Sequence, residues 1–299
     1  MKILITGGTG FIGRALTKSL LNQAHEVSVL SRNPASVEKL FGHRVHSVNH
    51  FRQIDAETAF DVIINLAGAP IFGARWTQQR KKIIRDSRIG LTEALLSAID
   101  RMTVKPKLLI SGSAIGYYGD QGDGILTERS SPRVDFSHTL CADWEAAALK
   151  AEEFGTRVCL MRTGLVIGPN GGLLQRMLLP FRLGLGGRIG SGKQWMSWIH
   201  LHDWIKIAER MISDSSMQGV YNATAPNPVT NAEFTEILAN GLHRPALLPV
   251  PGGLLKILLG EMSELLLASQ RVLPERLLTR GFEFEYSDFA EAIDQVLVD

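Results

Sequence analysis

The chain has 299 residues, which is enough for about two domains or for one large α/β unit with a smaller appendage. Its 32 Lys and Arg residues nearly balance 30 Asp and Glu residues, and a net charge of +2 is too small to indicate binding to the phosphate backbone of nucleic acid. A hydrophobic content of 45% and a charged content of 21% exclude a disordered or fibrous protein.

The cysteines and the hydrophobic stretches indicate in which cellular compartment the protein is expected. The two cysteines, Cys141 and Cys159, and the lack of a CxxC pair argue against disulfides and a structural zinc site, so we expect a cytoplasmic protein without a metal. The apolar run at 2–5 is too short for an export signal. The stretch 252–267 is interrupted by three charged residues, which predicts a buried or interface helix and no membrane span. The stretch has a single lysine, which disfavours a helix that lies on a membrane surface. For the oligomeric state, a homodimer is one option.

Apolar runs alternate with helix-like stretches through the first half of the chain. The run at 2–5 leads into a glycine-rich turn and then into helical spacing over 11–21. Further strands are predicted at 26–30, 61–66, 107–110 and 157–161, and helices over 78–99 and 136–154. This alternation predicts right-handed βαβ crossovers and an α/β fold, a Rossmann-type doubly wound parallel sheet.

The pattern changes after Pro169 to scattered helices, short strands and glycine-rich loops. We therefore predict a Rossmann domain over 1–168 and a smaller mixed α/β region over 169–299 that binds the substrate. The second region is expected to close over the site, and the chain is free to cross between the two.

The glycine-rich turn reads TGGTGFIG over 6–13, with glycines at Gly7, Gly10 and Gly13. The first glycine allows a sharp turn out of the strand, the second lets the backbone approach a pyrophosphate, and the third lets helix and strand pack closely. The N-terminus of the following helix offers free amide donors to the phosphates. Because the motif follows a strand and opens a helix, it predicts a dinucleotide site.

The end of the second strand selects the dinucleotide. NAD enzymes usually place a carboxylate there, beside the ribose 2′-hydroxyl, whereas this chain has Ser31 and Arg32. Glu26 opens the strand and so lies at the wrong end of it. A guanidinium and a hydroxyl suit a 2′-phosphate, which predicts NADP (NADPH) as the cofactor. The alternative is that Arg32 is only a solvated surface charge.

Several motifs together resemble the extended short-chain dehydrogenases/reductases, over nearly the whole chain. They are TGGTGFIG at 6–13, NLAG at 65–68, SGSA at 111–114 with Tyr117 and Tyr118 after it, RTGLVIGP at 162–169 and WIHLHD at 198–203. The blocks at 178–200 and 260–282 resemble, more narrowly, the atypical YfcH-like epimerase-family branch of the NAD-dependent epimerase/dehydratase superfamily, whose members end in a C-terminal domain of unknown function.

The resemblance implies an NADP-binding Rossmann domain. It also implies the activity after which the family is labelled, that of a nucleotide-sugar epimerase. It also implies cofactor contacts throughout the glycine turn and at the strand ends. The implied contacts are Gly7, Thr9, Gly10, Phe11, Ile12, Gly13, Ser31, Arg32, Leu66, Ala67, Arg88 and Val166. Arg88 lies in the predicted helix 78–99, and Val166 lies in RTGLV, where the resemblance places it beside the nicotinamide.

The catalytic pair of the superfamily is missing. Its chemistry needs a tyrosine and a lysine four residues apart, on one face of a helix, but none of the four tyrosines of this chain is followed by such a lysine. On the expected helix, one alignment places Ser137 and Cys141 at the two positions, and another places Thr139 and Asp143 there. Neither alignment restores the pair, so standard dehydrogenase or UDP-sugar epimerase chemistry is in doubt.

Substitutes for the missing pair lie at the end of the strand that should face the nicotinamide. Ser113 is a candidate to bond a substrate oxygen, and Tyr117 or Tyr118 is a candidate acid. The alternative is a simple turn with one tyrosine packed and the other exposed. Cys141 is a candidate reactive thiol, although helical cysteines are usually small buried apolar residues.

Two further patterns were weighed. GRIGSGK at 187–193 has the spacing of a phosphate-binding P-loop, but Gln194 replaces the magnesium ligand and a strand follows in place of a helix. In the extended relatives this loop contacts a substrate diphosphate, which would involve Arg188 and Lys193, yet their diphosphate-binding arginine falls here at Met196. His200, His202 and Asp203 lie close together, but a structural role is favoured over a metal site.

The sequence therefore favours an NADP(H)-binding oxidoreductase or epimerase that acts on a small polar or nucleotide-sugar-like molecule at the C-terminal edge of the sheet. The alternative is a non-catalytic NADP(H)-binding sensor or scaffold protein, because the catalytic pair is absent.

Overall fold

The computed structural model describes residues 1–298, and its core is a seven-stranded parallel sheet. The strand order is β11-β7-β5-β4-β1-β2-β3. The strands are β1 (Lys2–Thr6), β2 (Glu26–Leu30), β3 (Val45–Val48), β4 (Val62–Asn65), β5 (Leu108–Ala114), β7 (Arg157–Thr163) and β11 (Gly219–Ala223). The order reverses at β1, so the carboxyl ends of β1 and β4 border the crevice in which open α/β sheets bind ligands.

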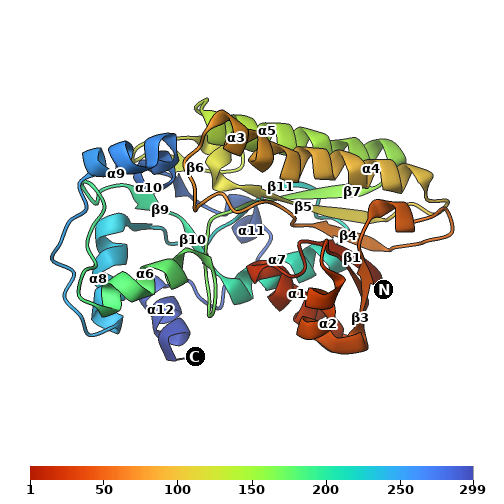
Figure 1. The fold of residues 1–299 in the computed structure, drawn as a ribbon, viewed down its shortest axis with the longest axis horizontal. Helices are drawn as coiled ribbons and strands as arrows, with labels where there is room; N and C mark the ends of the chain where they lie inside the picture. Colours follow the sequence, from red (N-terminus) through yellow and green to blue (C-terminus); the bar gives the residue numbers. More distant parts are fainter. Residues whose placement is uncertain (299) are drawn as a thin grey trace.

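Helices cover both faces of the sheet (Figure 1). On one face lie α1 (Phe11–Asn22), α2 (Pro34–Phe41) and α7 (Leu201–Ser213), and on the other α3 (Gln78–Arg85), α4 (Leu91–Arg101) and α5 (Phe136–Leu149). Ile3 and Ile5 of β1 belong to the core beneath α1 and α7, whereas Leu4 between them belongs to the opposite core. Burial of both faces explains why the central strands are continuous apolar runs.

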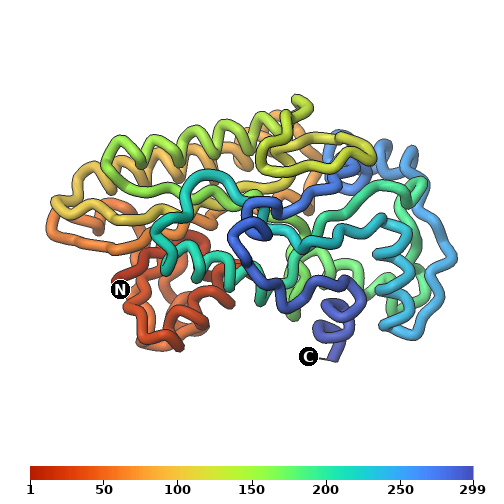
Figure 2. The backbone as a smooth tube through the Cα atoms, turned by 180° about the vertical axis from the view of Figure 1, so that it is seen from behind, coloured from red at the N-terminus to blue at the C-terminus, as the bar shows by residue number. Residues whose placement is uncertain are grey.

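The C-terminal region forms a second lobe at the end of the sheet (Figures 1 and 2). Its helices are α6 (Gly172–Arg182), α8 (Asn231–Gly241), α9 (Gly252–Leu259), α10 (Glu264–Leu267) and α12 (Phe289–Val298), whereas α11 (Glu275–Thr279) packs against the Rossmann core beside β11. Two pairs of short strands join the first part of the chain to the C-terminal region: β6 (Ile125–Leu126) with β13 (Arg271–Val272), and β8 (Leu165–Ile167) with β10 (Trp198–His200). A third pair, β9 (Trp195–Met196) with β12 (Val229–Thr230), lies within the C-terminal region. The second lobe has a hydrophobic core of its own, which includes Trp198, Phe234 and Phe289.

The chain crosses between the two regions more than once. Helix α7 and strand β11 lie beyond residue 168 in the sequence, but they pack with the Rossmann sheet. In the opposite direction, β6 comes from the first half of the chain and pairs with β13 of the second. The prediction of a Rossmann-type doubly wound sheet is confirmed, and the sequence patterns missed β3 and β11.

The hydrophobic stretch 252–267 is divided into α9, a 3₁₀ turn (Gly260–Ser263) and α10. Helix α9 has no buried residue, and Ile257 is 74% exposed, so the expectation of a buried helix is wrong for this segment. The Arg75 side chain holds the end of α9 by donating to the backbone oxygens of Ile257 and Leu258. No helix within residues 1–298 has the length and apolar character needed to cross a bilayer.

Candidate functional site

The glycine turn closes tightly between the end of β4 and the start of α1. Gly7 has a φ of +72°, which favours glycine, and a Cβ atom there would lie 2.8 Å from the Leu66 carbonyl carbon. A Cβ at Gly13 would overlap the Gly7 carbonyl oxygen and lie 2.7 Å from Gly8 Cα. The missing side chains therefore create a cradle of bare backbone at the C-terminal edge of the sheet.

Helix α1 points its N-terminus into this cradle. Its N-cap, Gly10, has no side chain to bond the first turn, so the amide groups of Phe11 and Ile12 stay available to a ligand. Gly10 itself donates to the Gly7 carbonyl at 3.0 Å, which fixes the turn. Free amides at the positive end of a helix are suited to a dinucleotide pyrophosphate, and the bare cradle gives it room.

The end of β2 lies beside the turn. Thr6 and Leu30 are partners in the β1–β2 register, so Ser31 and Arg32 follow at the same edge. Ser31 bonds within its own turn to Asn33, whereas Arg32 is exposed and has no hydrogen-bond or ion-pair partner within residues 1–298. No carboxylate occupies this strand end, and an unpaired guanidinium there fits a ribose 2′-phosphate.

The loop after β4 forms the other wall of the cradle. Leu66 lines it, and the Ala67 amide donates to Thr6 Oγ1 at 3.2 Å. Arg88 lies in a π-helical turn (Asp86–Gly90) between α3 and α4 and donates to the Ala69 and Ile84 carbonyls, both at 3.2 Å. Such π turns are frequent at functional sites. Arg88 also faces the ligand side of the cradle. Two of its hydrogen bonds, however, are used to hold the loop after β4.

A cavity of about 690 Å³ extends from this cradle into the second lobe. At one end it is lined by Gly7, Gly10 and Phe11, and at its centre by Ser113 and Cys141. Beyond the centre its walls come from β9, α6 and α10, so it connects the dinucleotide cradle with residues contributed by the C-terminal region.

The register of α5 is settled by the side chains that reach the cavity. Ser137, Cys141 and Trp144 line it, at helical spacings that place them on one face. Asp143 instead forms an ion pair with Arg85 at 2.7 Å, and Thr139 is exposed. Of the two pairs left open by the sequence, Ser137 and Cys141 therefore face the cavity and Thr139 and Asp143 do not line it.

Ser113 belongs to a buried polar network behind the cavity wall. Its hydroxyl donates to Glu145 Oε1 at 2.6 Å, and Arg162 donates to both oxygens of Glu145 at 2.8 Å. Burial alone would lower the pKa of Arg162, but the bonds and charge of Glu145 outweigh it and raise that pKa. The network holds the Ser113 hydroxyl in a fixed position at the edge of the sheet.

The two tyrosines after β5 are part of the same network and not of the cavity wall. The Arg162 guanidinium lies 3.3 Å from the centre of the Tyr117 ring, and its Nη1 donates to the Tyr118 hydroxyl at 3.1 Å. Tyr118 donates in turn to Asn222, and burial raises the Tyr118 pKa to about 12. The structure therefore places neither candidate acid in the cavity wall: the Tyr117 ring stacks on the Arg162 guanidinium, and Tyr118 is buried as a neutral phenol.

Cys141 lines the cavity beside Ser113 and Ser137. Burial, together with the negative charge of Glu145, raises the pKa of the Cys141 thiol to about 12. The thiol is therefore neutral at ordinary pH, which disfavours a thiolate nucleophile.

Val166, which the resemblance places beside the nicotinamide, lies near the cavity and not in its wall. Val166 in β8 packs against the hydrophobic core, whereas its neighbours Gly164 and Leu165 line the cavity. Sequence reasoning missed Trp144, although it follows Ser137 and Cys141 at helical spacing on the same face. It also missed Leu265 of α10, which no local pattern connects with the cradle.

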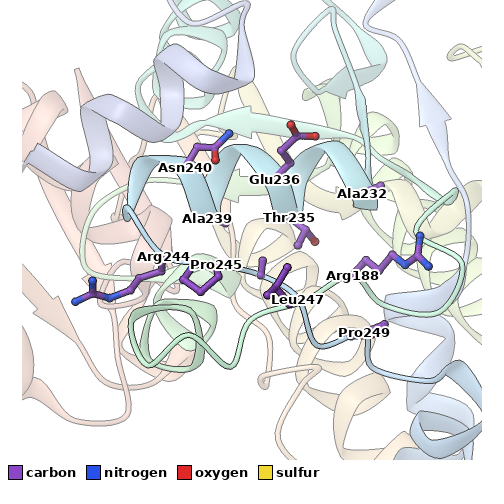
Figure 3. A pocket seen from close by; sticks show the side chains of 11 residues that line it. Arg188, Ala232, Thr235, Glu236, Ala239, Asn240, Arg244, Pro245, Leu247 and Pro249 are labelled. Carbon is purple, nitrogen blue, oxygen red and sulfur yellow. The ribbon is translucent and has the colours of Figure 1, made fainter.

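The P-loop-like segment takes no part in the cradle. It leads into β9 without a helix, and Lys193 is exposed. Arg188 lines a separate pocket of about 460 Å³ against α8, where Figure 3 shows it with Thr235 and Pro249.

The neighbouring histidines are used structurally. His200 Nδ1 accepts the His202 amide at the start of α7, and His200 Nε2 bonds Gln295 at 3.0 Å. No group of three or more His, Cys, Asp or Glu side chains within residues 1–298 is arranged to hold a metal ion.

Comparison with known proteins accounts for this arrangement. The model of the NAD dependent epimerase/dehydratase family matches residues 3–223. The chain belongs to this family. Residues 250–296 match a second family, the domain of unknown function DUF1731, which contains α9, α10, α11 and most of α12 of this epimerase-family protein.

Relatives of this epimerase-family protein match nearly all of this chain and most of their own length. Epimerase family protein YfhF of Bacillus subtilis is 41% identical over 302 residues, which covers 100% of this chain and 99% of that protein. The chloroplastic SDR39U1 homolog of Arabidopsis thaliana is 38% identical over 306 residues, covering 99% and 87%. The crystal structure of human epimerase family protein SDR39U1 with NADPH superposes with a TM-score of 0.90 at 33% identity and covers 100% of both chains. A UDP-galactose 4-epimerase, 18% identical with a TM-score of 0.74, shares the fold.

Proposed function

We propose that this epimerase-family protein is an NADPH-dependent oxidoreductase that reduces or oxidises a small molecule at Ser113. The observation that carries the proposal is the single cavity of about 690 Å³ that runs from the glycine cradle past Ser113, Ser137 and Cys141. A protein that only stored the dinucleotide would need no room beyond the position of the nicotinamide.

The choice of NADPH over NADH is supported by the end of β2. Arg32 is exposed and unpaired within residues 1–298 at the edge where a 2′-phosphate would lie, and no carboxylate is present there. The related human protein was crystallised with NADPH. Gly7, Gly10 and Gly13 would hold the pyrophosphate, and Leu66 and Arg88 would border the adenosine side.

When bound, the nicotinamide supplies or accepts a hydride. Reduction of a carbonyl also requires a proton at its oxygen as the C=O double bond becomes a C–O single bond. The hydroxyls of Ser113 and Ser137 line the cavity at this edge. Ser137 has no side-chain hydrogen bond within residues 1–298, so its hydroxyl is available to donate to a substrate oxygen. The Ser113 hydroxyl donates to Glu145, so its oxygen is oriented to accept the proton of a substrate hydroxyl while its own proton moves toward Glu145, and reduction would use the reverse path.

A second function is favoured by one specific observation, the loss of the tyrosine and lysine. Ser137 and Cys141 line the cavity on the helix where the pair is expected, and neither side chain is an acid or a cation at ordinary pH. The alternative is therefore a protein that binds NADPH without turnover, as a sensor or a scaffold.

The test is NADPH oxidation by the full-length protein with a panel of carbonyl compounds. Ser113→Ala should lower turnover at least tenfold with little change in NADPH affinity, because the hydroxyl acts in proton transfer. The matched control is Ser111→Ala, which removes a buried hydroxyl from the same strand that does not line the cavity. Tight NADPH binding with no turnover of any compound would overturn the proposal and favour the sensor.

A further inference from the structure

We propose that the substrate is an apolar molecule with one carbonyl or hydroxyl group, and not a nucleotide-diphosphate sugar. The inference rests on the proposed oxidoreductase function. It replaces the polar or nucleotide-sugar-like substrate expected from the sequence, and four observations on the far half of the cavity carry it.

The first observation is the chemistry of the walls beyond the nicotinamide edge. They are formed by large apolar side chains from β9, α6, α10 and the loop before β9. These side chains are Met177, Ile189, Trp195, Met196, Leu265 and Leu266. A pocket with such walls gains binding energy from apolar surface and offers little to a sugar or a uracil ring.

The second observation is that the uncharged polar side chains Asn231, Gln270 and Ser197 of this half are already bonded to the protein. Asn231 accepts the Ile189 amide at 2.7 Å and directs its amide group at Met196 Sδ. Gln270 donates to two backbone carbonyls at 3.1 Å, and the Ser197 hydroxyl donates to the Gln270 carbonyl at 2.7 Å. Hydroxyl groups of a bound sugar would therefore gain no partners among these three side chains to replace the water they lose.

The third observation is the negative charge of the side chains that line this half of the cavity. In the described part of the chain, the charged side chains that line the cavity are Arg88, Asp135 and Glu264. Arg88 is engaged with the loop of the cradle, which leaves two carboxylates near the second lobe. Burial, Asp135 and Glu261 raise the pKa of Glu264, whereas Lys81 and Lys256 lower it less. A diphosphate would be repelled by this pair of carboxylates.

The fourth observation is the position of the cations that would bind a diphosphate. Arg188 lines the separate pocket against α8 (Figure 3), and Lys193 does not line the cavity. Met196 of β9 also lines this half of the cavity, so an apolar side chain and no cation occupies this part of the wall.

The polar groups that remain lie together at the reacting end. Ser113, Ser137 and Cys141 line the cavity at the edge of the sheet, where one oxygen atom of a substrate would be held. The cavity thus has a small polar end and a large apolar end, which matches an aliphatic or aromatic ketone, aldehyde or alcohol.

The experiment compares binding of acetophenone, octanal and UDP-glucose to full-length protein saturated with NADP⁺, by isothermal titration calorimetry. Acetophenone or octanal should bind at least tenfold more tightly than UDP-glucose. Met196→Arg should weaken binding of the apolar probe about tenfold, because it places a charge in an apolar wall, while the control Met196→Leu stays within about twofold of the parent.

Each outcome decides the inference. Tighter binding of UDP-glucose, failure of both apolar probes to bind, or an apolar affinity unchanged by Met196→Arg would overturn it. Turnover with NADPH separates this result from the proposed function. Binding of acetophenone or octanal without NADPH oxidation would refute the oxidoreductase and support the substrate class. Oxidation of UDP-glucose by NADP⁺, or reduction of glyceraldehyde by NADPH, with no turnover of the apolar probes would support the oxidoreductase and refute the substrate class.

Discussion

Replacement of Arg162 by methionine tests the buried network that orients Ser113. Arg162 and Glu145 are only 4% and 7% exposed, and two 2.8 Å hydrogen bonds join them. Arg162→Met leaves the Glu145 carboxylate buried without its cation, and removal of one partner from such a pair costs about 3–5 kcal/mol. We expect the free energy of unfolding to fall by about 4 kcal/mol, because the contacts to Tyr117 and Tyr118 are lost as well.

The assay is urea unfolding of the parent, Arg162→Met, Glu145→Leu and the double variant. Replacing both partners by apolar side chains leaves no buried charge, so the double variant should be more stable than either single variant. Single variants that each lose less than about 1 kcal/mol would show that the pair is not the support of this wall. A double variant that loses the sum of the two single losses would refute the coupling.

The other predictions concern the cofactor and pH. Arg32→Ala should weaken NADPH binding about tenfold or more and leave NADH binding unchanged, measured by fluorescence titration; equal NADPH affinity would contradict the role of Arg32. Gly13→Ala should abolish NADPH binding because its Cβ would overlap the turn, whereas Gly253→Ala, with no atom within 4 Å of the added Cβ, should bind normally. Burial lowers the pKa of His200, so the unfolded chain gains a proton first as the pH falls below about 6.5 and stability is lost. His200→Asn keeps a cap for α7 and should flatten this loss between about pH 7 and pH 5 in thermal unfolding; an unchanged slope would assign it to other groups.

The cofactor half of the site was predictable because it is local. The turn at Gly7, Gly10 and Gly13 joins one strand to the next helix, and its geometry depends on neighbours in the sequence. The position of Arg32 follows from the end of the next strand. These features need only the strand, turn and helix periods and the absence of side chains at three positions.

The catalytic half depends on contacts between distant segments, and the sequence left it open. The register of α5 could not be chosen from its own residues. It is determined by Glu145, which binds Arg162 of β7, and by Asp143, which binds Arg85 of α3. Tyr117 looked like an acid beside the nicotinamide because the attraction of its ring for Arg162 cannot be read from a local pattern.

The walls of the substrate half were least visible in the sequence. Leu265 and Leu266 read as part of one hydrophobic stretch, and the break at Gly260–Ser263 is what allows α10 to line the cavity while α9 stays exposed. Arg188 read as a phosphate contact from its glycine-rich loop, but that loop directs it to the pocket against α8.

The central claim is that the cradle and the apolar cavity form one reaction site. The most direct measurement is transfer of deuterium from NADPH, labelled at the transferable position of the nicotinamide ring, to acetophenone or octanal by the full-length protein, followed by mass spectrometry of the product. We predict an alcohol that carries the label, with its amount sharply reduced by Ser113→Ala and unchanged by Ser111→Ala. NADPH that binds tightly while every product stays unlabelled would contradict the account.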